Sequence, residues 1–544
     1  MRIAAHRGTR LHAPENSRAA LVSAYTAGAD VLEFDVQLTK DGALVLSHDG
    51  TTDRVTGHAG KIIDQSLEDL KKLDWSETFE PRNSPGFHYF TDPKRMLAPL
   101  TFPAVLEALP DDVELLLELK HDSSETTGQR DKFVRTALEG LRLHGAVERT
   151  VVYSKDPENL KLARGLEPAL LVAAFDFTKS PAEQLELLRS TKADGLVTDL
   201  ESVLINGQLT NFGTQLKAFC GEKNLKVGAI LYPSRTPGIF TKTEYEALRQ
   251  HEFVWSVSTD SMIDVLGFVR QAGPKIETSF SGEKVDRENF ALGYAKANEF
   301  VNVFQKDGIH VDITKYDRDF PPLPDNPLER KVQELETKLL YTAKDWPYYS
   351  GGGVGYVPGI RGDFSAEVEY AVKVVGQATT LEMAVLNVDP GAHMGHPPKS
   401  FRDKDSFYDP HGAPPYVGVE HDEDDGYRIN WNLGSEYDSN QYGRPVGDGR
   451  TPRGARLRLD RRGPYFAAYY REAVDGAGAA LGPHDWVCVG VVRNDSLNPV
   501  LYLRCVGKRW RQESETNPDE FMPILANHFV FKKLTITRKS FRNR

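Results

Sequence analysis

The sequence predicts an α/β TIM-like (β/α)₈ barrel followed by an all-β antiparallel sandwich of jelly-roll type. In residues 1–273, short apolar runs alternate with helical stretches, and about eight such units in this length fit a (β/α)₈ barrel. In residues 274–544, apolar and polar residues alternate strictly, as in half-buried antiparallel strands. A doubly wound open sheet is the alternative for the first half, because periodicity does not reveal whether a sheet closes.

The chain is also long enough to require two domains. It has 544 residues, more than one ordinary core accommodates. We therefore place one domain at residues 1–273 and a second at 274–544.

Composition narrows the partners and the compartment. The formal net charge of −11 argues against nucleic acid, which usually needs a basic face. No apolar run is long enough to span a membrane, and no signal peptide is visible, which predicts a cytoplasmic protein. If the sequence is a trimmed mature form, a secreted or periplasmic location is expected instead. Cys220, Cys488 and Cys505 give no disulfide framework, in keeping with a reducing compartment.

The predicted barrel strands are short and mostly apolar, as strands buried on both faces are. They lie at residues 3–6, 31–38, 44–48, 114–120, 150–154, 170–176, 195–199, 226–231 and 254–260. The first helix is the clearest, with Asn16 as its expected N-cap and Gly28 as the residue that ends it.

The predicted sandwich strands are bounded by Gly, Pro and Asp. They lie at residues 365–375, 379–389, 427–433, 455–460, 465–471, 486–493, 499–506 and 529–538. One helix is expected near 328–344, and loops at 351–353 and around 397–415. The acidic run at 421–425 is more often a solvated loop than a Ca²⁺ site.

Charged side chains gather at the ends of the N-terminal strands, and in a barrel such ends converge on one mouth. Glu33 and Asp35 point to the same side of one strand, and Glu118 and Lys120 share a side of another. Three carboxylates would repel one another unless a cation lay among them. Oxygen ligands alone favour one divalent cation, Mg²⁺ or Ca²⁺.

The remaining residues of this group suit the cleavage of a phosphodiester. Arg7 is able to hold a phosphate with two hydrogen bonds, and Lys120 adds positive charge. Histidine titrates near neutrality, so His6 and His48 are able to divide the acid and base roles of one displacement.

Seven short motifs give the chain a resemblance to the glycerophosphodiester phosphodiesterase family. They are His6-Arg7-Gly8, Pro14-Glu15-Asn16-Ser17, Gly28-Ala29-Asp30, Glu33-Phe34-Asp35-Val36, Thr39-Lys40-Asp41-Gly42, His48-Asp49 and Glu118-Leu119-Lys120. Their order and spacing match the family over about 120 residues. Weaker likeness continues to about residue 270, where Thr259-Asp260 resembles the family's last strand end.

The resemblance implies a metal-dependent hydrolase that releases glycerol 3-phosphate and an alcohol from a small glycerophosphodiester. It assigns His6 and His48 to acid/base catalysis, Glu33, Asp35 and Glu118 to the metal, and Arg7 and Lys120 to the phosphate. It also implies that the glycerol 2-hydroxyl attacks first, giving a cyclic phosphate that water then opens.

Two segments depart from the family pattern. Residues 228–233 replace its Trp-Thr-Val-Asn strand, which puts an aromatic wall of the alcohol pocket in doubt, and Trp255 is a candidate substitute. Residues 76–99 form a longer insertion that carries several aromatic residues. These residues either pack the insertion, the favoured interpretation, or cap the mouth.

Two other functions stay open. The barrel would also suit a phospholipase D-like lyase that releases a cyclic phosphate. The C-terminal half loosely resembles concanavalin A-like jelly rolls, so the chain is alternatively a protein that binds a glycan or cell-wall polymer through this half.

Overall fold

The computed structural model describes most of the N-terminal half and a set of strands in the C-terminal half. The described residues are 1–81, 87, 89–90, 94–120, 126–270, 272–280, 289–293, 301–305, 307–312, 349–374, 379–387, 415–422, 426–433, 441–442, 454–472, 485–510 and 528–539. Two compact units are present, one built mainly from Met1–Tyr89 and Pro93–Gln271 and the other mainly from Ala272–Ser540. Within the described residues, no helix has the length and apolarity needed to cross a membrane.

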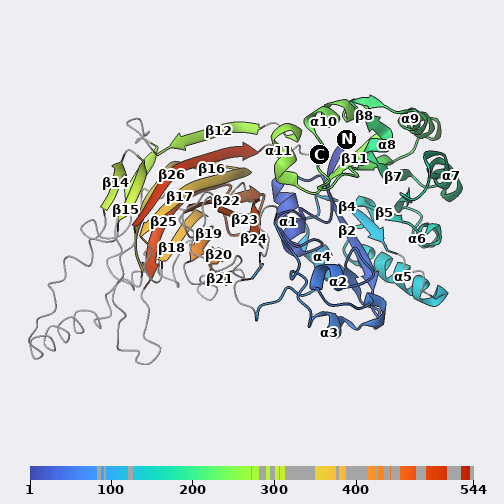
Figure 1. Cartoon of the computed structure of the whole chain (residues 1–544), viewed down its shortest axis with the longest axis horizontal. Coiled ribbons are helices and arrows are strands. Elements are labelled where there is room, and N and C mark those ends of the chain that lie inside the picture. The colour runs from blue at the N-terminus through green and yellow to red at the C-terminus, as the bar shows by residue number, and fades with distance from the viewer. Residues whose placement is uncertain are drawn as a thin grey trace, which may run out of the picture. The chain divides into compact units, whose positions relative to one another are not determined.

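The first unit contains a closed barrel of eight parallel strands (Figure 1). They are β1 (Arg2–Ala5), β2 (Val31–Leu38), β4 (Glu114–Leu119), β5 (Thr150–Ser154), β6 (Leu171–Phe175), β7 (Gly195–Asp199), β10 (Gly228–Tyr232) and β11 (Val254–Thr259). Strand β1 pairs with both β2 and β11, and these pairings close the sheet on itself. The predicted TIM-like barrel is therefore confirmed, and the open sheet is excluded.

Helices follow the barrel strands in the chain and cover the outside of the barrel (Figure 1). The longer ones are α1 (Arg18–Ala27), α4 (Phe102–Ala108), α5 (Thr127–Leu143), α6 (Pro157–Leu166), α7 (Pro181–Thr191), α9 (Asn211–Lys223), α10 (Lys242–Leu248) and α11 (Met262–Val269). Shorter segments are α2 (Asp53–Thr56), α3 (Leu67–Leu70) and α8 (Leu200–Val203), with 3₁₀ turns at Ile62–Asp64 and Val147–Arg149.

Helix α1 begins one residue later than the sequence suggested. Its N-cap is Ser17, whose hydroxyl accepts a hydrogen bond from the backbone N–H of Ala20 at 3.1 Å. The predicted cap, Asn16, lies outside the helix with φ 55° and bonds instead to Asp35. Gly28 ends the helix at φ 104°, as predicted.

One predicted barrel strand has a different place in the sheet. Residues 44–48 were expected to add a barrel strand, but β3 (Leu44–Leu46) runs antiparallel to the end of β2 and lies at the sheet edge. It forms a hairpin that extends β2 beyond the barrel and turns back, with Leu38 opposite Leu44 and Val36 opposite Leu46. The period-2 apolar pattern is the same in both arrangements, so the sequence did not distinguish them.

The second unit consists of antiparallel sheets. One sheet has the order β14-β15-β26-β17-β22-β23-β24, with β12 also paired to β26, and the other has the order β13-β16-β25-β18-β19-β20-β21. The bounds are β12 Ala272–Ser279, β13 Phe290–Gly293, β14 Val301–Gln305, β15 Gly308–Asp312, β16 Tyr349–Arg361, β17 Phe364–Val374, β18 Thr379–Leu386, β19 Tyr416–Asp422, β20 Gly426–Asn432, β21 Gln441–Tyr442, β22 Gly454–Arg462, β23 Tyr465–Glu472, β24 Val487–Arg493, β25 Val500–Trp510 and β26 His528–Lys539.

Buried aromatic rings join the two sheets. Tyr427 of β20 stacks on Tyr470 of β23 with ring centroids 3.7 Å apart, and His421 of β19 stacks on Tyr427. An antiparallel two-sheet arrangement is thus present, while the jelly-roll type and a glycan ligand stay predictions.

Some details of the C-terminal prediction were wrong. The glycine-rich residues 351–353 form part of strand β16 rather than a loop, and β19 was not predicted. Gly353 packs against the neighbouring strand so closely that an added Cβ would lie 2.2 Å from the carbonyl oxygen of Cys505, which explains why glycine occurs in a strand here. The helix expected near 328–344 lies outside the described residues.

Candidate active site

Strands β2 and β4 bring three carboxylates together. Glu33 and Asp35 alternate with outward-facing residues on β2, and Asp35 is the register partner of Glu118 on β4. One oxygen from each carboxylate lies within 4.8 Å of the others. All three side chains are buried, so their charges are poorly screened by water.

Glu33 is the most enclosed of the three. Its two oxygens accept hydrogen bonds from the backbone N–H of Arg7 at 2.7 Å and from the Tyr153 hydroxyl at 2.8 Å. Burial, reinforced by the negative charge of Asp35, raises the pKa of Glu33 well above its usual range. The metal-free site therefore favours the protonated form of this carboxyl.

Lys120 lies between the other two carboxylates. Its Nζ is 3.1 Å from Asp35 Oδ1 and 2.6 Å from Glu118 Oε2. Burial alone would raise the pKa of Asp35, but Lys120 and Arg7 outweigh it and hold that pKa well below its usual range. For Glu118 burial prevails, and its pKa is raised despite Lys120.

The cluster has the chemistry of a hard-cation site. Three carboxylates face only two cationic side chains, Arg7 and Lys120, and all of the acidic ligand atoms are oxygens. Among the described residues, the buried Asp35 Oδ1 has the Lys120 ammonium as an ion-pair partner but accepts no hydrogen bond of regular geometry. These features fit Mg²⁺ or Ca²⁺ held by the three carboxylates.

Arg7 lies between this cluster and a fourth carboxylate. Its guanidinium is 3.5 Å from Asp35 and donates to both oxygens of Glu15 at 3.2 and 3.3 Å. That 3.5 Å contact is made by its buried Nε, which forms an ion pair with Asp35 Oδ2 but makes no hydrogen bond among the described residues. The next residue must be glycine, because a Cβ on Gly8 would lie 2.4 Å from the backbone of Ala20 in α1.

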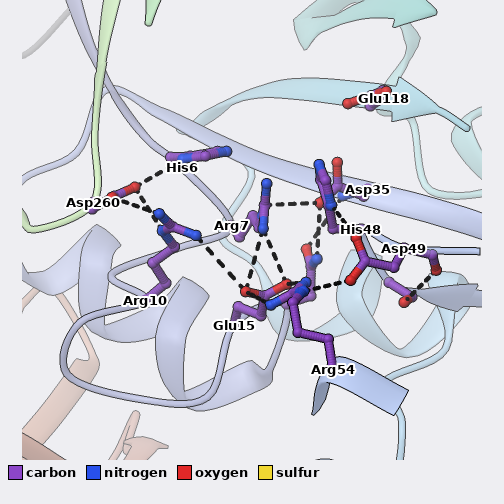
Figure 2. A network of polar contacts seen from close by, with 12 residues as sticks. His6, Arg7, Arg10, Glu15, Asp35, His48, Asp49, Arg54, Glu118 and Asp260 are labelled. Carbon is purple, nitrogen blue, oxygen red and sulfur yellow. Dashed lines mark hydrogen bonds and ion pairs between the residues drawn. The ribbon is translucent and has the colours of Figure 1, made fainter. Parts of the chain in front are cut away.

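His6 follows β1 directly and is oriented by an aspartate from the last barrel strand. Its Nδ1 lies 2.8 Å from Asp260 Oδ1, and its backbone N–H bonds to Thr259 (Figure 2). Asp260 is fixed in turn by the backbone N–H of Gly238 at 2.7 Å and by Arg10 at 2.8 Å. Burial and the nearby Arg7 lower the pKa of His6 to about 4, although Asp260 opposes this shift.

His48 has a matching arrangement on the other side of the site. Its Nδ1 lies 2.6 Å from Asp49, which pairs with Arg54 (Figure 2). The hairpin β2–β3 explains its position: the N–H of Ser47 bonds to the carbonyl of Asp35, so the returning strand carries His48 back to the level of the carboxylates. His48 thus reaches the mouth as predicted, but from an antiparallel strand.

Aromatic residues line the barrel near His6. The ring of Tyr232, at the end of β10, contacts His6 edge-on at 5.1 Å, and its hydroxyl lies 3.4 Å from that of Tyr153. Phe177 continues this surface, 6.2 Å from Tyr232, and is 40% exposed. The atypical segment 228–233 therefore supplies an aromatic wall after all.

Trp255 does not take that role. It lies near the start of β11, where the guanidinium of Arg2 at the start of β1 stacks 4.8 Å from its ring. Because the barrel strands are parallel, this is the end opposite the mouth. Position along the strand, rather than residue type, decides the outcome.

The aromatic residues around the insertion are largely buried, which supports the packing interpretation. Trp75 belongs to a small core with Val45, Ile62 and Leu70 and donates its indole N–H to a backbone carbonyl. Phe87 and Tyr89 each meet Phe79 edge-on. His88, which also belongs to this insertion, lies outside the described residues.

The structure brings all seven predicted side chains into one neighbourhood and adds others that the sequence argument did not use. Asp49 and Asp260 orient the histidines, Glu15 contacts arginines, and Tyr153 and Tyr232 line the interior. Glu15, Asp49 and Asp260 each belong to a motif that carries the family resemblance, so the sequence contained a signal for them. Asp260 is 254 positions from His6, and only closure of the barrel makes them neighbours.

Comparison with known proteins points to one family. The sequence model of the Glycerophosphoryl diester phosphodiesterase family matches residues 6–228. A Glycerophosphodiester phosphodiesterase of Caldanaerobacter subterraneus is 33% identical over 175 residues, 31% of this chain and 64% of that protein. Glycerophosphodiester phosphodiesterase 1 of Homo sapiens is 35% identical over 123 residues, 23% of this chain and 35% of that protein. The chain thus spans about one third to just under two thirds of these relatives.

A solved structure has a related description. A phosphodiesterase of Oleispira antarctica in complex with its product sn-glycerol-3-phosphate is 20% identical, with a TM-score of 0.38, and the match covers 49% of this chain and 96% of that one. The match to the glycerophosphoryl diester phosphodiesterase family covers residues 6–228, the part of the chain that holds both histidines and the three clustered carboxylates.

Proposed function

We propose that the barrel hydrolyses glycerophosphodiesters to glycerol 3-phosphate and an alcohol, with one divalent cation, Mg²⁺ or Ca²⁺. The observation that carries this proposal is the pair of histidines, each bonded through Nδ1 to an aspartate, beside three clustered carboxylates. The relatives named for this activity support it, and the family model matches residues 6–228, which include both histidines and the three carboxylates.

The two histidines would share one proton transfer. When Nδ1 of His6 donates its hydrogen to Asp260, Nε2 keeps a lone pair, and the lowered pKa leaves the ring neutral near pH 7. His6 then suits the base that takes the proton from the attacking hydroxyl. His48 suits the acid that gives a proton to the leaving alkoxide as its bond to phosphorus breaks. In the second step, in which water opens the cyclic phosphate, the roles reverse.

Positive charge would hold the phosphate while this happens. Arg7 offers its guanidinium, whose Nε makes only a 3.5 Å ion pair with Asp35, and Lys120, directly after β4, offers a second cation. Glu33, Asp35 and Glu118 would hold the divalent cation, which when bound stabilises negative charge on the phosphate oxygens in the transition state. The aromatic surface of Tyr232 and Phe177 would border the leaving alcohol.

The test is release of glycerol 3-phosphate from a panel of glycerophosphodiesters. We expect His6→Ala and His48→Ala each to lower kcat about 10²–10⁴-fold with the fold retained. His251→Ala is the matched control, because His251 precedes β11 at the opposite end of the barrel. Full activity in either active-site variant would exclude the proposed roles.

The lyase alternative differs only in the final product. Phosphorus NMR of the reaction separates them, because a hydrolase accumulates glycerol 3-phosphate and a lyase accumulates the cyclic phosphate. A cyclic product that persists after the diester is consumed would favour the lyase.

A further inference from the structure

Two separate segments carry the two histidines. His6 and Arg7 lie in the segment between β1 and α1, whereas His48 lies in the segment that runs from the end of β3 through helix α2, residues 47–57, which also carries Arg54. A one-step proton exchange requires both rings to be held at fixed positions on either side of one phosphate. Glu15 lies where these two segments meet.

Glu15 binds arginines from both segments. Its oxygens accept hydrogen bonds from Arg54 Nη2 at 2.6 Å and Nη1 at 2.9 Å, a bidentate pair that crosses between the segments. Arg7 contacts the same carboxylate at 3.2 Å, and Arg10 approaches within 3.9 Å. The Glu15 side chain is only 13% exposed, although Arg54 is 44% exposed.

Each of these arginines binds a second carboxylate that serves the site. Arg10 donates to Asp260, the partner of His6, and Arg54 pairs with Asp49, the partner of His48. Arg7 lies beside Asp35. Figure 2 shows the resulting chain of contacts, which runs from His6 through Asp260, Arg10, Glu15, Arg54 and Asp49 to His48.

We infer that Glu15 is a positioning residue that ties the two histidine-bearing segments together and sets the spacing of His6 and His48. This inference rests on the proposed function for its catalytic consequence. Glu15 touches neither histidine, so it acts through Arg54 on one side and through Arg10 on the other. Glu15 also contacts Arg7, so its loss should weaken phosphate binding as well as turnover, whereas loss of Arg54 should affect turnover alone.

The arrangement differs from an ordinary surface ion pair, which is worth little because water screens it. Glu15 is largely enclosed, and Arg7 and Arg54 both donate hydrogen bonds to it. Arg142 is the contrasting case: it is similarly exposed to Arg54, at 48%, but pairs with a single carboxylate, Glu167, on the outer helices.

The first test measures how firmly the two segments are held together, and it does not depend on enzymatic activity. Amide hydrogen exchange is followed in the full chain for wild type, Glu15→Gln, Arg54→Gln and the control Arg142→Gln. We expect both site variants to raise exchange at least several-fold across residues 47–57, with Arg142→Gln unchanged there. Unchanged exchange in this segment in both site variants overturns the inference, even if the wild type proves to be an active diesterase.

The second test reads the catalytic consequence. Because the Arg54 guanidinium is bonded to Glu15 and Asp49 and has no assigned part in phosphate binding, Arg54→Gln should lower kcat about tenfold to a hundredfold with KM nearly unchanged. Glu15→Gln should lower kcat similarly and also raise KM, since it releases Arg7. The double variant should be no worse than Glu15→Gln, because both changes break the same tie.

Multiplicative losses in the double variant would contradict this coupling. If the wild type hydrolyses no glycerophosphodiester but the exchange at 47–57 rises as expected, the proposed function fails while the structural tie stands. The two ideas are therefore separable by experiment.

Discussion

The two units of this protein bury carboxylates in opposite ways. In the second unit, Asp460 receives two hydrogen bonds from Arg458 at 2.9 and 3.0 Å, one from Ser365 at 2.6 Å, and the ammonium of Lys539 at 3.0 Å. Burial alone would raise its pKa, but the two cations outweigh burial and lower it to about 2. In the barrel, burial and a neighbouring carboxylate instead raise the pKa of Glu33.

This difference distinguishes a carboxylate with a structural role from a group of carboxylates that forms a candidate functional site. A buried ion is tolerated when the chain itself supplies the opposite charge and the hydrogen bonds, as at Asp460. The barrel gathers Glu33, Asp35 and Glu118 with only Arg7 and Lys120 as cationic neighbours, and in the metal-free site a proton on Glu33 reduces the excess of negative charge. Under the proposed function a divalent cation would take the place of that proton, so the excess of acid, rather than burial, marks the candidate site.

The largest expected effect is on activity. Glu33→Gln should lower kcat at least a hundredfold, because it removes one of three metal ligands, yet it should not destabilise the metal-free barrel, since a neutral amide avoids the cost of burying a carboxylate at this position. Asp460→Asn should leave the barrel's activity unchanged. Steady-state kinetics of both variants tests this, and equal losses would break the comparison.

The next largest effect is on stability, and here Asp460→Asn should have the larger effect of the two variants. Asp460→Asn leaves Arg458 and Lys539 without their buried counter-charge, so we expect unfolding of the second unit to become easier by about 3–5 kcal/mol. Calorimetry of the full chain resolves this transition. A variant as stable as the wild type would mean that Asp460 does not balance these cations.

Metal binding should raise the free energy of unfolding of the barrel alone, and by less than the loss expected for Asp460→Asn. Removal of the cation with EDTA should abolish activity, and Mg²⁺ or Ca²⁺ should restore it. Metal at about 100 times its Kd should stabilise the barrel by about 2.7 kcal/mol. We expect this shift in Asp460→Asn and not in Glu33→Gln; activity that survives exhaustive chelation would exclude the metal.

The smallest effect is a pair of opposite pH dependences in the metal-free protein. Asp460 has a folded-state pKa of about 2 against a usual 3.8, so its contribution of about 2 kcal/mol is present above pH 3.8 and is lost as pH falls through 2. Glu33 has a raised pKa, so its contribution is present below about pH 4.5 and is lost as pH rises.

Denaturant titrations between pH 2 and 8 test these signs. Relative to wild type, Asp460→Asn should make the free energy of unfolding depend less on pH below pH 3.8. Glu33→Gln should make it depend less on pH above pH 4.5. Identical pH profiles in the three proteins would show that the two carboxyls do not differ in this way.

The sequence determined much of the barrel because local patterns are sufficient there. Glu33 and Asp35 share a side of β2 through the two-residue period of a strand, and β4 places Glu118 and Lys120 by the same rule. Buried parallel strands ending in charged residues made the site recognisable before any coordinates existed. The antiparallel alternation of the second half had the same local origin.

The tertiary structure decided whatever depends on distant partners. Whether 44–48 joins the barrel or folds back on β2, whether Trp255 or Tyr232 lies by His6, and which carboxylate orients each histidine are long-range properties. Asp260 meets His6 only because β11 pairs with β1, and Glu15 meets Arg54 only because helix α2 lies beside the loop between β1 and α1. Periodicity fixes which side of a strand a residue faces, but only closure of the sheet determines what it faces.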